Sequence, residues 1–257
     1  MTALEALLRY WRAQDDLFER IDVRPWGAVV SDGRYPRIQE ANYARVETRR
    51  PVRLEEVEAD LLPALGRSGA RRSHVVVFHP EDQTDLLAAA STRGERLSWD
   101  LVMVHRGPAD APTDTRVREV TAFDPRFWRA YRVTARLFGI GDQADLDQLE
   151  AIERELLIPA GRRWFQVPER GGTAALAALL ILEGSAYVDH VVTTPSARGR
   201  GHAGALTDRL VAEAFAAGAG RVFLLAEPEG LAAAMYARRG FRPLTRIASW
   251  ISEPGRR

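Results

Sequence analysis

The sequence predicts an α/β protein with a mixed sheet, organised as two lobes. Short apolar runs typical of strands alternate with segments of helical periodicity along the 257 residues. The segment from Gly107 to Thr113 contains a glycine and two prolines and has the composition of a linker. We therefore expect one lobe over residues 1–112 and a second over residues 113–257.

The N-terminal lobe is predicted to contain helices and strands in alternation. Apolar residues at helical spacing predict its helices, which cover Leu4 to Ile21, Leu54 to Leu65 and Pro80 to about Ala90. Gly66 is expected to end the second helix, because glycine readily adopts the left-handed conformation that closes a helix. Short apolar runs predict the strands, which cover Trp26 to Val30, Tyr43 to Glu47, Val75 to Phe78 and Leu97 to Val104.

The C-terminal lobe is predicted to begin with a strand over Arg116 to Phe123. Asp124 before Pro125 is a typical helix cap followed by a first-turn proline. The two helices that follow cover Pro125 to Phe138 and Gln143 to Leu157. A three-strand meander then covers Trp164 to Val167, Thr173 to Leu182 and Ala186 to Thr193. The last elements are a helix from Gly201 to about Ala217, a strand over Val222 to Ala226, a helix from Pro228 to Gly240 and a strand from Phe241.

The composition excludes several classes of function. Apolar residues make up 46% of the chain, and the net charge of +1 gives no reason to expect a nucleic acid or an anionic membrane as partner. All 36 basic residues are arginine, which excludes mechanisms that need a lysine. The absence of cysteine excludes disulfides and thiolate metal sites, and we expect no bound metal. A cytoplasmic location is expected, since the longest apolar run, Ala174 to Leu182, is too short to span a bilayer.

The segment from Thr193 to Leu206 is the most informative part of the chain, because it joins a strand to a helix and is rich in glycine and arginine. Glycines there would let backbone amides approach a phosphate at the helix N-terminus. Gly199-x-Gly201-x-x-Gly204 matches a dinucleotide fingerprint, with Glu227 placed like a ribose-binding acid. Two observations oppose that interpretation. Four residues separate the strand from the first glycine, and a meander precedes the loop where a dinucleotide fold would begin.

A second pattern in the same segment is Arg198-x-x-Gly201-x-Ala203. With Tyr236-Ala237-Arg238-Arg239-Gly240-Phe241 and the order of the elements, it resembles the GNAT superfamily of acetyl-CoA-dependent N-acyltransferases. The resemblance covers the chain from Arg116 onward. It implies a GNAT fold in the C-terminal lobe and acetyl-CoA as co-substrate.

The resemblance also implies which residues bind the co-substrate. Backbone groups of Val191, Val192 and Thr193 would hold the acyl carbonyl and the pantetheine arm. The pyrophosphate would bind to loop amides, those of Arg198, Gly199, Arg200, Gly201, His202 and Ala203. A pyrophosphate needs several converging N–H donors and an approach free of side chains, which the small residues Gly201 and Ala203 provide.

Tyr236 is the predicted general acid, because a phenol can donate a proton to the departing thiolate. The general base is less well defined. Members of the family often use a Glu, Asp or His for this task, and the candidates are Glu183, Asp189 and His190. Strand alternation puts Asp189 and His190 on opposite faces of the sheet, so at most one of them can face the acceptor. His190 could equally be a structural histidine, and a dedicated base could be absent.

The N-terminal lobe is predicted to be a degenerate copy of the same plan, with an unrelated α/β lobe as the alternative. Val75 to Glu81 parallels Val222 to Glu229. In each copy a buried strand meets Pro-Glu, followed by a helix, an Arg-Gly pair and a strand with a tryptophan, Trp99 or Trp250. The segment from Thr48 to Arg53, which takes the place of the phosphate loop, contains no glycine. We therefore expect this lobe to bind no acetyl-CoA.

The sequence thus predicts an N-acetyltransferase that moves an acetyl or short acyl group from acetyl-CoA to a primary amine by direct attack in a ternary complex. No residue near the site is a suitable covalent nucleophile. The alternative is a non-catalytic acyl-CoA-binding regulatory module, which would not need Tyr236.

The sequence does not determine the acceptor, which could be a small-molecule amine or a peptide N-terminus. It does not determine the oligomeric state either, and a homodimer is one of the options. Arginine pairs such as Arg162-Arg163 are interpreted as solvated faces.

Overall fold

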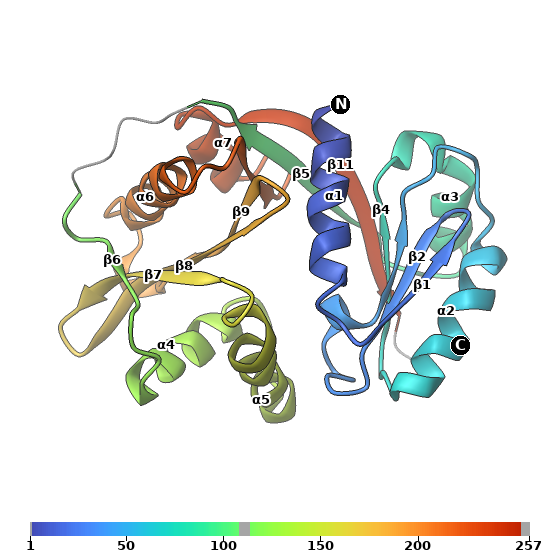
Figure 1. Ribbon diagram of the computed structural model, residues 1–257, viewed down its shortest axis with the longest axis horizontal. Coiled ribbons are helices and arrows are strands. Elements are labelled where there is room, and N and C mark those ends of the chain that lie inside the picture. The colour runs from blue at the N-terminus through green and yellow to red at the C-terminus, as the bar shows by residue number, and fades with distance from the viewer. Residues whose placement is uncertain (1, 108–113, 253–257) are drawn as a thin grey trace. The chain divides into compact units, whose positions relative to one another are not determined.

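The computed structural model describes residues 2–107 and 114–252, and its backbone divides into two compact units (Figure 1). One unit consists of residues 1–101 and 245–257, and the other of residues 102–244. The predicted boundary after residue 112 lies outside the described residues. The units differ from the predicted lobes in that the end of the chain belongs with its beginning. No helix in the described part of the chain is long and apolar enough to cross a membrane.

The strands of the first unit lie in the order β1-β2-β3-β4-β11. The first three form an antiparallel meander, β4 is parallel to β3, and α2 connects these two strands. The strands are β1 (Arg20–Arg24), β2 (Gly27–Ser31), β3 (Tyr43–Val46), β4 (Ser73–Val77) and β11 (Arg242–Ser252). The helical elements are α1 (Ala3–Asp15), η1 (Gln39–Ala41), α2 (Leu54–Ser68), η2 (Pro80–Asp82) and α3 (Thr84–Thr92).

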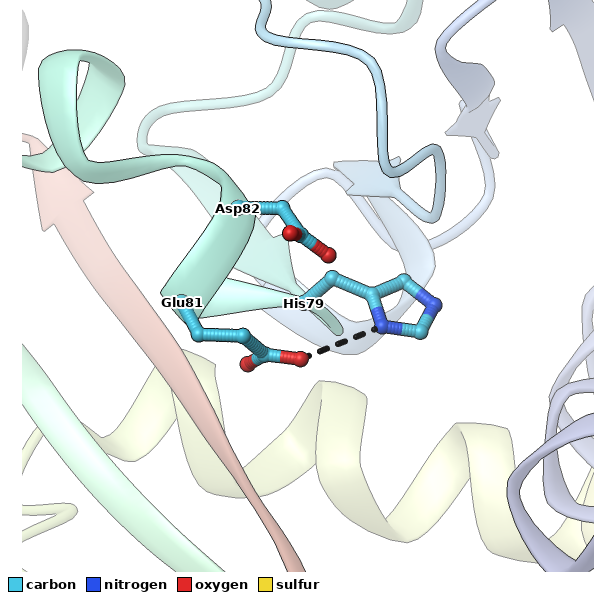
Figure 2. Close-up of side chains that lie close together, drawn as sticks. All are labelled: His79, Glu81 and Asp82. Carbon is cyan, nitrogen blue, oxygen red and sulfur yellow. Dashed lines mark ion pairs between the residues drawn. The ribbon is translucent and has the colours of Figure 1, made fainter.

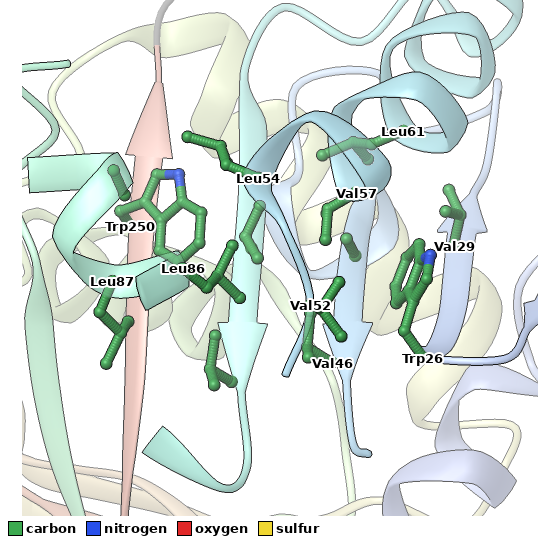
Figure 3. Close-up of a cluster of buried hydrophobic side chains, with 14 of the residues drawn as sticks. Trp26, Val29, Val46, Val52, Leu54, Val57, Leu61, Leu86, Leu87 and Trp250 are labelled. Carbon is green, nitrogen blue, oxygen red and sulfur yellow. The ribbon is translucent and has the colours of Figure 1, made fainter. Parts of the chain in front are cut away.

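Alternation along β3 supports helices on both faces of the first unit's sheet. Ala44 and Val46 belong to a buried cluster that they share with residues of α2 and α3 (Figure 3). Tyr43 and Arg45 point to the other face, where they donate hydrogen bonds of 2.6 Å and 2.8 Å to the buried carboxylate of Asp15 in α1. The pleat of one short strand thus holds α1 on one side and α2 on the other.

The strands of the second unit lie in the order β6-β7-β8-β9-β10-β5. The strands β6 to β9 are antiparallel, and β9 and β10 are parallel. The strands are β5 (Ser98–His105), β6 (Arg118–Glu119), β7 (Arg163–Glu169), β8 (Gly172–Leu182), β9 (Ser185–Thr193) and β10 (Arg221–Ala226). The helical elements are α4 (Pro125–Arg136), α5 (Gln143–Ile152), η3 (Glu153–Leu157), η4 (Pro195–Ala197), α6 (His202–Ala216) and α7 (Leu231–Ala237).

Helices also cover both faces of the second unit's sheet (Figure 1). On one face, α4 places Phe127, Trp128 and Tyr131 in a buried cluster with Trp164 of β7. On the other face, α6 packs across β7, β8, β9 and β10. The connection from β9 to α6 therefore lies at one end of the sheet, at the point where the glycine- and arginine-rich segment occurs.

The start of the chain differs from its prediction, because α1 ends at Asp15 and residues 20–24 form β1 in place of a helix to Ile21. Gly27 explains the turn into β2. Its φ is 153°, and a Cβ there would lie only 1.8 Å from the carbonyl oxygen of Arg45 in β3. Only glycine allows this close approach, so β1 and β2 form a hairpin against β3.

Other elements differ mainly at their ends. Gly66 lies inside α2, which ends at the left-handed Gly69, with φ 69°. The strand predicted over Arg116 to Phe123 is reduced to the two residues of β6. The helix predicted from Pro228 begins at Leu231.

One strand at the edge of each unit's strand order comes directly after a helix of the other unit in the chain. β11 follows α7 in the chain but pairs with β4, from Ala248 opposite Val77 to Ser252 opposite Ser73. β5 follows α3 but continues into the second unit, where it is the neighbour of β10. The two units therefore exchange their last strands.

Trp250 of β11 should stabilise the first unit in spite of its distance in the sequence. It is 3% exposed and belongs to the buried cluster of that unit (Figure 3). We expect Trp250→Ala to lower the free energy of unfolding by about 3–5 kcal/mol in urea denaturation, since it deletes a buried aromatic side chain. Trp99→Ala is the matched control, because Trp99 is the predicted counterpart in β5 but is 39% exposed. Equal losses in the two variants would contradict the exchange of strands.

Candidate active site

The loop between β9 and α6 leaves the N-terminus of α6 open to a ligand. Gly199 and Gly201 have φ of 77° and 79°, in the left-handed region that favours glycine. No atom of the described residues lies within 4 Å of a Cβ built at either position. The carboxylates of Asp124 and Asp142 cap α4 and α5, whereas α6 begins after Gly201 without a side-chain cap from the described chain. Its first-turn amides can therefore bind an anion.

Gly204, the third glycine of the overlapping fingerprint, has a packing role. A Cβ at Gly204 would lie 1.8 Å from Nη2 of Arg239, because this side chain crosses α6 there. Arg239 Nε also lies 3.1 Å from Oδ1 of Asp208 in the same helix. Contact between α6 and the end of α7 thus explains the glycine spacing that matches a dinucleotide fingerprint, without a ligand.

A pocket of about 410 Å³ adjoins the start of α6 on the side of β7 and β8. Its lining includes His202 and three guanidinium groups, those of Arg116, Arg118 and Arg200. Arg200 pairs with Glu169 at 2.9 Å and Arg116 pairs with Asp114 at 2.6 Å, and the charge of Arg118 favours an anionic ligand. Neither Tyr236 nor His190 lines the pocket, so it suits the phosphates of a ligand and not its reacting group.

A β-bulge interrupts β9 at His190. Leu176 of β8 faces Val192 and Ala178 faces Asp189, so two residues of β9 oppose one residue of β8. His190 has φ 53°, which is uncommon for a residue other than glycine. Because alternation fails at a bulge, the prediction that Asp189 and His190 lie on opposite faces does not hold. Both side chains have partners around Trp164, as described next.

Aromatic rings surround the imidazole of His190. Tyr131 stacks on it at 5.5 Å between ring centroids, and Phe138 and Trp164 meet it edge-on at 5.0 Å and 5.1 Å. Its Nε2 lies 3.0 Å from Oγ1 of Thr134. Burial lowers the pKa of His190 to about 4, so the ring is neutral at neutral pH.

The hydrogen bonds of Thr134 indicate the tautomer of His190. The Thr134 hydroxyl donates to the carbonyl oxygen of Tyr131 at 2.9 Å, so its oxygen accepts from the imidazole. On this ground we assign the proton to Nε2. Nδ1 is then the atom that can accept a proton.

Arg162 lies in the interior between two acids, and its interpretation as part of a solvated face is wrong. Its side chain is 9% exposed, with Nη2 2.6 Å from Oδ2 of Asp189 and Nε 3.4 Å from Oε1 of Glu153. Its guanidinium also lies 5.3 Å from the ring of Trp164. Burial alone would raise the pKa of Asp189, but the Arg162 charge and hydrogen bonds from Arg162 and the His190 amide lower it below its usual range.

Tyr236 lies in α7 and is 6% exposed. Burial, followed by the negative charge of Asp189, raises the pKa of Tyr236 to about 12. Tyr236, Asp189 and His190 thus all lie in the second unit, and Asp189 and His190 are neighbours at the bulge of β9.

Glu183 lies apart from the bulge of β9. It is exposed in the turn between β8 and β9, with φ 50°. This turn and the loop before α6 lie at opposite ends of the nine-residue β9, and an extended strand of this length spans about 30 Å.

The predicted acyl-binding residues lie at the loop end of β9. Val192 packs in the core beside Val191, and the carbonyl oxygen of Thr193 accepts a hydrogen bond of 3.4 Å from Arg198 Nε.

In the first unit, the loop before α2 is bonded to the side chain of Gln83. The side chain of Gln83 is 1% exposed and donates from Nε2 to the carbonyl oxygens of Thr48 and Arg50. Its Oε1 accepts from the amide of Val52 at 3.0 Å. The loop that replaces the phosphate loop is thus closed by a side chain of its own unit.

Sequence patterns gave no indication of three residues that surround the bulge of β9, namely Arg162, Glu153 and Thr134. Arg162 stands in an Arg-Arg pair, which usually marks a solvated surface. Glu153 lies in the π-helical turn η3 at the end of α5, where helical periodicity changes. Neither pattern carries a local signal of burial, because the burial depends on contacts across the unit.

A family comparison covers the same region. Residues 125–241 match the model described as the Acetyltransferase (GNAT) family. This segment includes the bulge at His190, the loop before α6 and Tyr236. No curated protein matches the sequence.

Solved structures of low sequence identity share the fold over most of the chain. A GCN5-related N-acetyltransferase from Kribbella flavida is 18% identical, with a TM-score of 0.63 over 96% of this chain and 95% of that one. A conserved protein of unknown function from Staphylococcus epidermidis ATCC 12228 is 13% identical, with a TM-score of 0.69 over 92% of this chain and 94% of that one. The family match and the shared fold agree with the sequence resemblance: residues 125–241 of this chain match the GNAT family of acetyltransferases, a family that uses acetyl-CoA as co-substrate.

Proposed function

We propose that this protein transfers an acetyl or short acyl group from acetyl-CoA to a primary amine, by direct attack of the amine on the thioester in a ternary complex. The observation that carries the proposal is the uncapped N-terminus of α6 behind Gly199 and Gly201, in the same unit as Tyr236 and the bulge of β9. Acyl transfer from coenzyme A needs an anion site for the phosphates and a proton donor near the sulfur. The acceptor class covers small-molecule amines and peptide N-termini.

The loop before α6 suits the pyrophosphate of the coenzyme. Amides from Arg198 to Ala203 would donate to its oxygens, and the dipole of α6 favours negative charge at this end. The arginines of the adjoining pocket add positive charge beside it. Backbone groups of Val191 to Thr193 would hold the acyl carbonyl and the pantetheine arm, as the family resemblance implies. The coenzyme itself supplies the activated acyl group and the thiol that leaves.

Tyr236 would act as the general acid. A phenol whose pKa is about 12 stays protonated at neutral pH, so it carries the proton that a departing thiolate takes up. Its low exposure keeps competing water away from that proton. The same low acidity makes it a poor nucleophile, which agrees with direct attack in place of a covalent intermediate.

His190 would accept the proton of the attacking amine at Nδ1. With a pKa of about 4 it is a weak base, so it does not deprotonate a free ammonium group at neutral pH. The amine nitrogen becomes far more acidic once it has bonded to the acyl carbon, and a weak base then suffices. The nearby Asp189 carboxylate stabilises the positive charge that the imidazole carries after it has accepted the proton.

The first unit is proposed to be a degenerate copy that binds no acetyl-CoA. It repeats the order of meander, helix, parallel strand and helix, which supports the copy. Gln83 fills its loop, which supports the loss of the cofactor site.

The buried state of His190 also favours a second candidate function for the protein, that of a non-catalytic acyl-CoA-binding module. Release of coenzyme A in the presence of a panel of amines separates the two, since only an enzyme releases it.

Gly201→Val should abolish acetyl-CoA binding, because a side chain would cover the amides at the start of α6 and strain a left-handed position. Gly184→Val is the matched control. Gly184 has φ 69° and equally open surroundings, but lies in the β8–β9 turn. Isothermal titration should give one acetyl-CoA per chain for the wild type and for Gly184→Val, and none for Gly201→Val. Two sites per chain would contradict a degenerate first unit.

Tyr236→Phe should lower kcat by about 100-fold or more while the Kd of acetyl-CoA changes less than about threefold, because only the proton donor is lost. The measurement is acetyl transfer at saturating amine together with a binding titration. Tyr43→Phe serves as control, since it also removes a buried phenol, here one that donates to Asp15 in the first unit. A parallel loss of turnover and of binding in Tyr236→Phe would give the tyrosine a structural role.

His190 should make stability fall as the pH is lowered. Its folded pKa of about 4 lies below the ordinary 6.5, so its contribution to stability is full above pH 6.5, decreases as the pH falls below 6.5, and is lost once the pH has fallen through 4. Between pH 7.5 and pH 5 we expect the wild type to lose about 2 kcal/mol of unfolding free energy through this group. The His190→Gln variant should lack that loss. His74 has a similarly lowered pKa, but it is present in both proteins and therefore contributes equally to both pH profiles. Identical pH dependence in urea denaturation would refute the assignment.

A further inference from the structure

We propose that His79, Glu81 and Asp82 form a binding site for a divalent transition-metal ion at the end of β4. One potential ligand atom from each of these side chains lies within 4.8 Å of the others, and His79 Nδ1 is 3.6 Å from Oε1 of Glu81. Figure 2 shows the three side chains turned toward one another from a single turn of the chain. The site belongs to the first unit and is independent of the proposed acyl transfer.

The backbone explains why this spacing gathers the three groups. Residues 80–82 form the 3₁₀ helix η2, with the Asp82 amide bonded to the His79 carbonyl oxygen at 3.0 Å. Residues three apart eclipse one another in a 3₁₀ turn, so His79 and Asp82 share one side. Pro80 fixes its own φ and stiffens the turn between them.

Gln83 anchors this turn to the rest of the unit. Its side chain makes three hydrogen bonds to the loop before α2, at Thr48, Arg50 and Val52. A ligand set on such a fixed turn does not have to be ordered when the ion binds. Preorganisation of this kind raises affinity.

His79 provides an independent indication of a ligand. The residue is only 6% exposed, yet its Nδ1 has no hydrogen-bond partner in the described part of the chain. Buried polar atoms are nearly always bonded, so an unpartnered one needs an explanation. Nδ1 faces the carboxylate of Glu81 (Figure 2), with a potential ligand atom of Asp82 close by, and an ion held by the three side chains would satisfy it.

The donor set indicates which metal the site would take. One imidazole nitrogen with two carboxylate oxygens suits Zn²⁺ or Mn²⁺, whereas Mg²⁺ and Ca²⁺ prefer ligand sets made only of oxygen. Three protein ligands leave at least one position of the metal for water. Glu81 is half exposed, so that position faces solvent.

Arg49 is the group that competes with the ion. Its Nη1 lies 3.0 Å from Oδ2 of Asp82 and 4.0 Å from Oε1 of Glu81, so it balances the two acids. The Arg49 side chain is 68% exposed and can swing into solvent at little cost. Its removal should therefore strengthen metal binding.

The test is isothermal titration of Zn²⁺ into the full chain and its variants, without acetyl-CoA. The wild type should bind one ion through this site. His79→Ala should weaken that binding beyond the 10–100-fold that loss of an outer-shell partner costs, and Asp82→Asn should weaken it at least about tenfold. Arg49→Gln should bind about fivefold tighter, because a neighbouring positive charge is gone. Asp85→Asn, which changes an exposed acid three residues beyond Asp82, should bind like the wild type.

Circular dichroism checks that each variant is folded, and where His79→Ala unfolds, Asp82→Asn decides. The absence of a saturable Zn²⁺ site in the wild type would overturn the proposal. Equal affinity in the wild type, His79→Ala and Asp82→Asn would overturn it as well. So would an Arg49→Gln variant that binds no tighter than the wild type. None of these results would bear on acetyl transfer.

Discussion

The unpaired amides at helix N-termini are the constraint that organises both units. Each helix begins with amides that have no partner within the helix and need one from elsewhere. Thr2, Asp124 and Asp142 meet this need at α1, α4 and α5. Gln83 ties down the loop before α2, whereas the start of α6 follows two left-handed glycines and is open to an outside anion. The corresponding loops of the two units thus differ in what binds them. A glutamine side chain bonds to the loop of the first unit, whereas the coenzyme would bind to the loop of the second unit in the proposed function.

A second constraint is the burial of Arg162. A buried guanidinium is tolerated only when it is paired, and here Glu153 and Asp189 both pair with it. The pairing fixes Asp189 as a carboxylate beside the bulge of β9, and that charge in turn raises the pKa of Tyr236. A substitution at Arg162 would therefore alter the pKa of Tyr236 through its effect on Asp189.

The sequence predicted the GNAT fold and the loop before α6 well, because both depend on local patterns: apolar runs, glycine spacing and the Tyr236 to Phe241 motif. It failed where structure depends on distant contacts. The alternation rule assumes a regular ladder, so it could not anticipate the bulge at His190, which depends on register with β8. The placement of β5 and β11 was equally hidden, since strand order in a sheet depends on pairing between segments far apart in the sequence. Arg162 looked exposed for the same reason.

The exchange of strands has a consequence for the order in which the protein is made. Ribosomes release the chain from its N-terminus, and domains generally fold as they emerge. In the unit built on residues 1–101, β4 has β3 on one side but lacks its second strand partner until residues 248–252 have been synthesised. We therefore expect the part translated first to be completed last, with the edge of β4 exposed to chaperones throughout translation.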